Sequence, residues 1–162
     1  MQAIVCADRN WGIGKNGELL VHIPEDMRRF RAATLGKTVI VGRKTLSTFP
    51  GGRPLAKRTN IILSGFGGLE IDGAQVVSSV GEALRRVEGL PAGDVFVIGG
   101  QQVYKEFLPY CTRAYVTRLN AAFNADRFFP ALDRSKEWRL AERSSLRRYG
   151  EFEFYYETFE KI

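Results

Sequence analysis

One carboxylate, Asp26, has neighbours that would suit proton or hydrogen-bond chemistry. Pro24 opens a predicted helix that runs to about residue 35, and Asp26 falls in its first turn. Met27 and Phe30 follow one and four positions later, on the same side of that helix. A carboxylate among apolar side chains at a cleft is a poor surface residue and a good site residue. The alternative is a charge that only stabilises the helix N-terminus.

Two glycine-containing turns could hold phosphate groups. Gly99 and Gly100 end an apolar run and precede a predicted helix over residues 101–107, where backbone N–H groups can approach a pyrophosphate. Residues 42–45, with the sequence GRKT, bring N–H groups, a hydroxyl and two cations together after another strand pattern. Lys44 taken alone could equally be a surface charge. Together the two turns favour a phosphorylated cofactor.

A third glycine motif, residues 12–17, matches the G-x-G-x-x-G pattern of dinucleotide sites but lacks their setting. That fingerprint needs a strand just before it and a helix opening at it. Here the strand pattern ends near Ala7, and Pro24 stops a helix that would begin at Gly17. We therefore interpret residues 8–23 as an irregular loop whose glycines let it close over a ligand.

The chain has 24 Lys and Arg against 18 Asp and Glu, a formal charge of +6. This favours anionic partners: phosphorylated cofactors, acidic substrates or nucleic acid. The cations are scattered and form no long block, which argues against an unstructured basic tail. RNA binding is the weaker alternative, because the aromatic residues lie mostly in apolar runs and not on a basic face. We expect no nucleic-acid partner.

Cys6, Cys111 and the lone His22 lack metal-ligand spacing, so no metal site is expected. We interpret both cysteines as buried free thiols. The sequence opens on a strand pattern without a signal segment, and no apolar stretch approaches the ~20 residues of a membrane span. The expectation is a cytoplasmic monomer with no membrane partner.

Strand and helix patterns alternate, which predicts one α/β domain over residues 1–162. Expected strands cover residues 2–7, 38–41, 60–64, 74–77, 94–98 and 113–119; expected helices cover 24–35, 79–88, 101–107 and a short segment ending at 48. Residues 138–142 and 151–160 predict an antiparallel hairpin. The expected fold is a central, mostly parallel, twisted sheet of about eight strands, with this C-terminal hairpin and about four flanking helices.

Seven segments, taken in order, resemble the dihydrofolate reductase family across nearly the whole chain. They are ADRNWGIG (7–14), IPEDMRRF (23–30), VGRKT (41–45), RTNIILS (58–64), VIGGQQVY (97–104), YVT (115–117) and DRFFP (126–130). No single segment is decisive, but the ordered set is specific. The resemblance implies the family fold and the NADPH-dependent reduction of 7,8-dihydrofolate to 5,6,7,8-tetrahydrofolate, in support of one-carbon metabolism and thymidylate synthesis.

The resemblance gives the catalytic roles to Asp26 and Thr117. Asp26 would accept hydrogen bonds from the pterin N3 and 2-amino groups, since an ionised carboxylate is acceptor-only. It would then promote protonation of N5, through water, as NADPH delivers hydride to C6. Thr117 would orient the carboxylate by a hydrogen bond, although on its own it could be an ordinary strand residue.

The same resemblance implies a substrate pocket. Its residues are Ile4, Cys6, Asp26, Met27, Phe30, Phe49, Leu55, Arg58, Ile98, Tyr104 and Thr117. Arg58 would pair with the glutamyl α-carboxylate through its planar guanidinium, with Lys57 as the alternative cation. Backbone carbonyls of Ile4 and Ile98 would meet the 4-amino group of antifolate inhibitors. Each apolar member, taken separately, could equally be a core residue.

The implied cofactor is NADPH. Its site is expected at Ala7, Ile13, Gly14, Gly42, Arg43, Lys44, Thr45, Leu63, Ser64, Gly65, Ile98, Gly99, Gly100, Gln101, Gln102, Val103 and Tyr104. Arg43 and Lys44, with Ser64 close by, would favour the 2′-phosphate and so NADPH over NADH. The family also has a cis peptide bond between the glycines that match Gly99 and Gly100.

The chain departs from the family pattern before the first helix. Val21 stands where the family usually has a tryptophan, whose indole holds an ordered water near the active carboxylate. The route of water to N5 and the affinity for antifolates are therefore open. Gln101 replaces a third glycine, and His22 is interpreted as a solvent-facing loop residue without a catalytic role.

A second enzyme class shares the expected fold and cofactor: the reductase domain of riboflavin synthesis. It lacks a Pro-Glu-Asp helix start followed by phenylalanine four positions after the aspartate, which this chain has at residues 24–30. It also usually carries a deaminase domain. Turnover of dihydrofolate against turnover of a ribosylaminopyrimidine separates the two.

Overall fold

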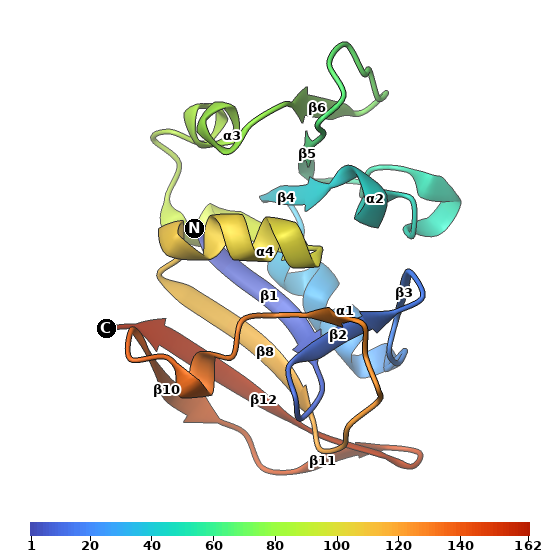
Figure 1. Ribbon diagram of the computed structural model, residues 1–162, viewed down its shortest axis with the longest axis vertical. Coiled ribbons are helices and arrows are strands. Elements are labelled where there is room, and N and C mark those ends of the chain that lie inside the picture. Colours follow the sequence, from blue (N-terminus) through green and yellow to red (C-terminus); the bar gives the residue numbers. More distant parts are fainter.

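A nine-stranded twisted sheet forms the centre of the computed structural model, which describes residues 1–162 (Figure 1). The strand order is β10-β12-β8-β1-β7-β4-β5-β6, and β11 pairs with β12 outside this path. The strands are β1 (Gln2–Ala7), β4 (Thr38–Gly42), β5 (Thr59–Leu63), β6 (Ala74–Val77), β7 (Val95–Gly99), β8 (Arg113–Leu119), β10 (Trp138–Arg143), β11 (Arg147–Tyr149) and β12 (Phe152–Lys161). The expected central sheet is confirmed, with boundaries within two residues.

Six adjacent strands, from β8 through β1, β7, β4 and β5 to β6, run parallel. The innermost of them are near-continuous apolar runs such as TVIVG in β4, because helices cover both sides of a parallel sheet. The C-terminal strands reverse this direction: β12 lies antiparallel to β8 on one side and to β10 on the other. The predicted hairpin is therefore the antiparallel end of the sheet, with the additional strand β11 at its tip.

The four expected helices are present and lie against the sheet. They are α1 (Pro24–Thr34), α2 (Arg43–Leu46), α3 (Val80–Arg86) and α4 (Gln101–Phe107), with short 3-10 turns at Pro50–Gly52, Ala92–Asp94, Leu108–Tyr110 and Leu132–Arg134. Pro24 occupies the start of α1, where its missing N–H costs no hydrogen bond. Ser79 caps α3 by accepting a hydrogen bond from the Glu82 backbone N–H. No helix is long and apolar enough to cross a membrane.

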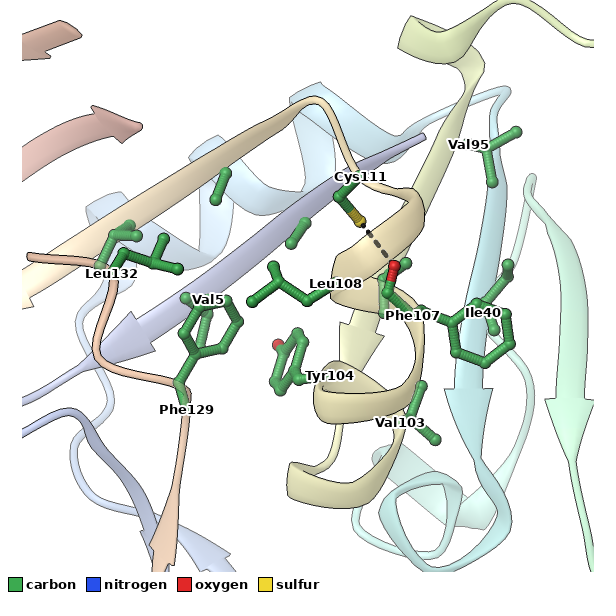
Figure 2. Close-up of a cluster of buried hydrophobic side chains, with 14 of the residues drawn as sticks. Val5, Ile40, Val95, Val103, Tyr104, Phe107, Leu108, Cys111, Phe129 and Leu132 are labelled. Carbon is green, nitrogen blue, oxygen red and sulfur yellow. Dashed lines mark hydrogen bonds between the residues drawn. The ribbon is translucent and has the colours of Figure 1, made fainter. Parts of the chain in front are cut away.

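The core has two parts, because side chains alternate between the two faces of β1. Ala3, Val5 and Ala7 face α4 and are buried in a large apolar cluster. Figure 2 shows this cluster: Tyr104 packs edge-on against Phe129, Phe107 lies toward Ile40, and the Cys111 thiol donates to the Phe107 carbonyl at 3.4 Å. On the other face, residues of α1 pack against β4, β5 and β7. The clusters fix α4 and α1 on opposite faces of the sheet.

The expectation of an irregular segment over residues 8–23 is wrong in part. β2 (Gly12–Lys15) and β3 (Glu18–Leu19) form a small antiparallel sheet with β9 (Arg127–Phe128). The Asp126 backbone N–H donates to the Gly14 carbonyl at 3.0 Å, and the Asn16 N–H donates to the Asp126 carboxylate at 3.0 Å. A Cβ on Gly12 would lie 2.4 Å from the Ala125 Cβ. These partners come from a segment more than a hundred residues away, so no local pattern reveals the pairing.

Candidate active site

The Asp26 carboxylate lies at the meeting point of α1 and the strands β1, β8 and β12. The Thr117 hydroxyl donates to Asp26 Oδ1 at 2.5 Å. Thr117 is buried, with 4% of its surface exposed, and its neighbours across the sheet are Cys6 in β1 and Tyr156 in β12. Burial raises the pKa of Asp26, while the Thr117 hydrogen bond and the Arg29 charge oppose that rise. The structure thus brings together both residues predicted to be catalytic.

Cys6 borders the carboxylate and is only half-buried, so the expectation that both cysteines are buried is wrong for this one. Burial raises the pKa of the Cys6 thiol, and the nearby Asp26 charge adds to the effect. The group is therefore a neutral, apolar-like wall. Cys111 is buried, as expected, and both thiols are free.

Five of the predicted pocket residues share one apolar surface on the α1 face of the sheet. They are Ile4, Phe30, Phe49, Leu55 and Ile98, which pack with Val39, Val41, Leu46 and Ile62. Met27 is not part of this cluster and has 46% of its surface exposed. The structure thus has an apolar surface on the side of the sheet where α1 carries Asp26.

Arg58 is half-buried beyond the end of α1 and is held in place by two hydrogen bonds. It donates to the Thr34 hydroxyl at 3.2 Å and to the Ala56 carbonyl at 2.9 Å. Burial lowers the pKa of Arg58, and Arg31 lowers it further. Lys57, the alternative cation, is exposed and has a positive φ of 59°. The anchored guanidinium is the better placed of the two for a planar anion.

Sequence reasoning missed Asn60, the residue that shapes the loop before β5. Its buried amide donates to the carbonyls of Leu55 and Arg58, and its oxygen accepts from the Leu55 N–H at 2.9 Å. Leu55 and Arg58 therefore depend on one side chain for their placement. A polar residue in an apolar strand pattern is the signal that could have identified it.

A cavity of about 710 Å³ opens beside the carboxylate and contains every residue predicted for the cofactor except Ala7. Ala7 is fully buried in the core at the end of β1. Cys6 lines the same cavity, so the cavity and the Asp26 region share a wall. The cavity also includes residues that were not predicted for the cofactor: Val5, Lys15, Gly17, Glu18, Leu19, Thr48, Phe66 and Arg127. Four of them belong to residues 8–23, the segment expected to close over a ligand. Most of these lie on or beside the small β2-β3-β9 sheet, whose pairing was not foreseen.

Two glycine turns, at the ends of β4 and β7, form the floor of this cavity. The Gly99–Gly100 peptide bond is cis, as the family resemblance implied. A Cβ on Gly100 would lie 2.7 Å from the Thr45 hydroxyl, and one on Gly42 would lie 3.2 Å from Val103. Only glycine leaves room for the Thr45 hydroxyl beside residue 100. Arg43, whose guanidinium stacks 4.8 Å over the Phe66 ring, and Lys44 stand at the rim.

Tyr104 connects the cavity to β1. Its buried hydroxyl donates to the Ile4 carbonyl at 2.7 Å, which ties α4 to β1. Burial raises the pKa of Tyr104 and keeps it a neutral donor. Gln101, which replaces a family glycine, accepts from the Phe128 backbone N–H at 2.6 Å and so ties α4 to β9.

Two residues before α1, Val21 and His22, were singled out in the sequence. Val21 packs against the apolar cluster of Ile23, Leu119 and Phe154. His22 is exposed, as expected. No group of three or more His, Cys, Asp and Glu side chains is arranged to hold a metal ion.

Comparison with known proteins matches both the sequence and the fold. The family model described as Dihydrofolate reductase matches residues 1–161. The chain is 39% identical over 137 residues to the dihydrofolate reductase of Bacillus subtilis, covering 85% of this chain and 79% of that protein. It is also 39% identical over 144 residues to the enzyme of Mycobacterium tuberculosis H37Rv, covering 83% and 85%.

A solved structure agrees over nearly the full length. Dihydrofolate reductase from Enterococcus faecalis, complexed with NADP(H) and RAB-propyl, superposes with a TM-score of 0.86 at 33% identity and covers 99% of this chain and 95% of that one. The sequence match therefore extends to the whole arrangement of sheet and helices that carries Asp26 and the glycine turns. On this evidence the chain belongs to the dihydrofolate reductase family.

Proposed function

We propose that the chain reduces 7,8-dihydrofolate to 5,6,7,8-tetrahydrofolate with NADPH. The observation that carries the proposal is the Asp26 carboxylate, held by Thr117 at an apolar wall and sharing Cys6 with a glycine-floored cavity. One site thus has an acceptor for a heterocycle next to a site for a phosphorylated cofactor. Membership of the dihydrofolate reductase family supports the same reaction.

Asp26 would hold the substrate by its pterin ring. Thr117 donates to Oδ1, which leaves acceptor positions on both carboxylate oxygens for the ring N3–H and the 2-amino group. Ile4, Phe30, Phe49, Leu55 and Ile98 would pack against the flat faces of the substrate. Arg58 would pair with the α-carboxylate of the glutamyl end, as a planar guanidinium is suited to do.

The residues lining the large cavity fit NADPH. Gly42, Gly99 and Gly100 line the cavity without side chains, so that a phosphate group could come close to their backbone. Arg43, Lys44 and Ser64 offer two cations and a hydroxyl for a phosphate on the ribose. NADPH, when bound there, supplies the hydride.

The residues around Asp26 would control the proton transfer to N5 of the substrate. Burial raises the pKa of Asp26, so its carboxyl group exchanges protons closer to neutrality than an exposed aspartate does. Asp26 lies where it can hold the pterin and favour protonation at N5 through a water molecule. The neutral Cys6 thiol beside it adds no competing charge.

The test is the loss of NADPH absorbance when dihydrofolate is added, for the unmodified protein and for Asp26→Asn. We expect the variant to fold and to lose about a hundredfold or more of its turnover near pH 7, because the acidic group is gone. Its rate should recover toward acid pH, where solvent protonates N5 directly. An antifolate such as methotrexate should block the unmodified protein.

Two results would contradict the proposal. Full activity of the folded Asp26→Asn protein would remove Asp26 from the reaction. Turnover of a ribosylaminopyrimidine without turnover of dihydrofolate would favour the reductase of riboflavin synthesis. Circular dichroism of both proteins is the control for folding.

We also propose that this reaction takes place in the cytoplasm and that the chain acts as a monomer. The two free cysteines, Cys6 and Cys111, suit a reducing compartment. Cell fractionation tests the location, and sedimentation of the purified protein tests the oligomeric state.

A further inference from the structure

A ring of four neighbouring side chains is formed by Asp26, Thr117, Tyr156 and Arg29. Thr117 of β8 donates to Asp26, and Tyr156 of β12 lies directly opposite Thr117 in the antiparallel pair. The Arg29 guanidinium lies 3.8 Å above the centroid of the Tyr156 ring. Arg29 follows Asp26 by three positions on α1, so the two side chains are neighbours on the helix surface. Each member of the ring is therefore placed by the next.

The C-terminal hairpin fixes this ring from outside. Glu25 accepts two hydrogen bonds from Arg147 of β11, at 2.6 and 2.9 Å, and a third from the Tyr156 hydroxyl at 2.8 Å. The Arg147 guanidinium also lies 5.4 Å from the Tyr156 ring centroid. The first turn of α1 is thus bound to two strands of the hairpin, and Tyr156 is held with its ring under Arg29.

The charges near Asp26 leave Arg29 as the cation that acts on it. Glu25 and Arg29 face it from α1, Cys6 from β1, Thr117 from β8 and Tyr156 from β12. The Glu25 carboxylate is paired with Arg147. The thiol and the phenol stay neutral, because burial raises the pKa of Cys6 and of Tyr156.

Arg29 has no carboxylate within ion-pair distance. The ion pairs of the structure involve other arginines and Lys37, and none includes Arg29. Its charge is held on an aromatic face instead, where it is not neutralised. Its charge therefore acts on Asp26 through space, beyond ion-pair distance, with no anion paired to it.

We propose that Arg29, seated on the Tyr156 ring, is a positioning residue that keeps the Asp26 carboxylate ionised and ready to accept the N–H groups of the substrate. Glu25 and Arg147 hold the aromatic ring of Tyr156 in place. The inference rests on the proposed function, since Arg29 acts through Asp26. It predicts that the carboxylate holds its proton more tightly once this guanidinium, or the ring beneath it, is removed.

The test measures Asp26 directly, without turnover. The ligand-free protein is labelled at the aspartate carboxyl carbons, the Asp26 signal is assigned from its absence in Asp26→Asn, and its titration is followed by NMR. We expect Arg29→Gln and Tyr156→Leu each to move the midpoint to higher pH, because both remove or release the cation. Arg28→Gln removes an equal charge from an exposed neighbouring position and should leave the midpoint in place. Tyr156→Phe keeps the ring and should do so too.

A kinetic measurement separates this inference from the proposed function. For each protein, the turnover rate is divided by the limiting rate that the same protein reaches at acid pH. On the alkaline side of the pH profile, this relative rate should be about twofold or more higher for Arg29→Gln than for the unmodified protein. An unchanged Asp26 titration in folded Arg29→Gln, or an equal shift in Arg28→Gln, would overturn the inference while leaving the proposed function standing. Absence of turnover in the unmodified protein would reject the proposed function while the titration still reports on Arg29.

Discussion

At the scale of single residues, the hydroxyl of Thr117 is the hydrogen-bond donor that meets the Asp26 carboxylate. A hydrogen bond to the ionised form lowers a carboxyl pKa, so Thr117→Val should raise the pKa of Asp26 beyond the rise that burial already causes. It should also leave the carboxylate free to rotate. We expect kcat/KM for dihydrofolate near pH 7 to fall about tenfold, the size typical of a hydrogen bond to a charged group.

Thr117→Ser is the matched control, because it keeps the hydroxyl and loses only a methyl group. Its kcat/KM should remain close to that of the unmodified protein. Equal losses in both variants would show that packing of Thr117, and not its hydrogen bond, matters.

Arg43 and Lys44 form a second residue-scale prediction, at the rim of the cofactor cavity. If they meet the 2′-phosphate, the double variant Arg43→Gln with Lys44→Gln should raise KM for NADPH about tenfold or more, since charge-assisted hydrogen bonds are lost. KM for NADH, which lacks that phosphate, should barely change. A parallel rise for both cofactors would place the two cations elsewhere.

At the scale of elements, α1 is fastened to the C-terminal hairpin through Glu25. Hydrogen bonds from Arg147 and then Tyr156 lower the pKa of Glu25 to about 2, from 4.5. A carboxyl group with a lowered pKa in the folded state stabilises the fold above its unfolded pKa. That stabilisation is lost as the pH falls from about 4.5 toward 2.

Glu25→Gln should therefore be less stable than the unmodified protein at neutral pH, by no more than ~1 kcal/mol because the pair is partly exposed and screened. The difference in unfolding free energy, measured by urea denaturation, should shrink between about pH 4.5 and pH 2. It should also shrink in high salt. A constant difference across that range would mean that Glu25 acts by shape alone.

The central strands β4, β5 and β7 were predictable from sequence because each buries a short run of β-branched residues. The small sheet of β2, β3 and β9 was not. Its strands have two to four residues, too few for any periodicity, and glycines occupy half of β2. Its pairing depends on Asp126, whose contacts with Gly14 and Asn16 cross more than a hundred positions of sequence.

The residues of the candidate site divide in the same way, into those that a local sequence pattern predicts and those that it does not. Residues within strand-turn-helix segments, such as Gly42 and Gly100, were predicted from local pattern and lie in the cavity. Lys15 and Arg127 line it from the small sheet and were not predicted, although the family resemblance did imply Ile13 and Gly14 of the same strand as Lys15. The role of Arg29 could not be predicted from the sequence of α1 alone, because the position of its guanidinium depends on the Tyr156 ring of β12.

At the scale of the whole molecule, Arg118 joins parts of the chain that the sequence keeps far apart. It donates to the carbonyls of Asp8 and Arg9 at 2.9 and 2.8 Å and lies 4.0 Å over the Trp11 ring. It also pairs at 3.4 Å with Glu157, which is fully buried. One guanidinium thus connects β8, β12 and the loop after β1.

Arg118→Met should lower the unfolding free energy by about 3 kcal/mol, because it leaves the buried Glu157 carboxylate with Arg143 as its one remaining ion-pair partner. Arg139→Met is the control: its ion pair with Glu160 has 63% of the arginine side chain exposed and should contribute under about 1 kcal/mol. Chemical denaturation of the two variants measures the contrast. Similar losses for both would contradict a special role for the buried pair.

The register of β12 against β8 has a consequence for insertions and deletions. Tyr156 pairs with Thr117 and faces α1, while its neighbour Glu157 pairs with Val116 and points to the opposite side. Removing one residue at the start of β12 would exchange these two sides, sending a carboxylate toward the substrate and a phenol toward Arg118. Length changes should be tolerated in the exposed connection at residues 145–146, but one lost residue in the strand would disable substrate capture and folding together.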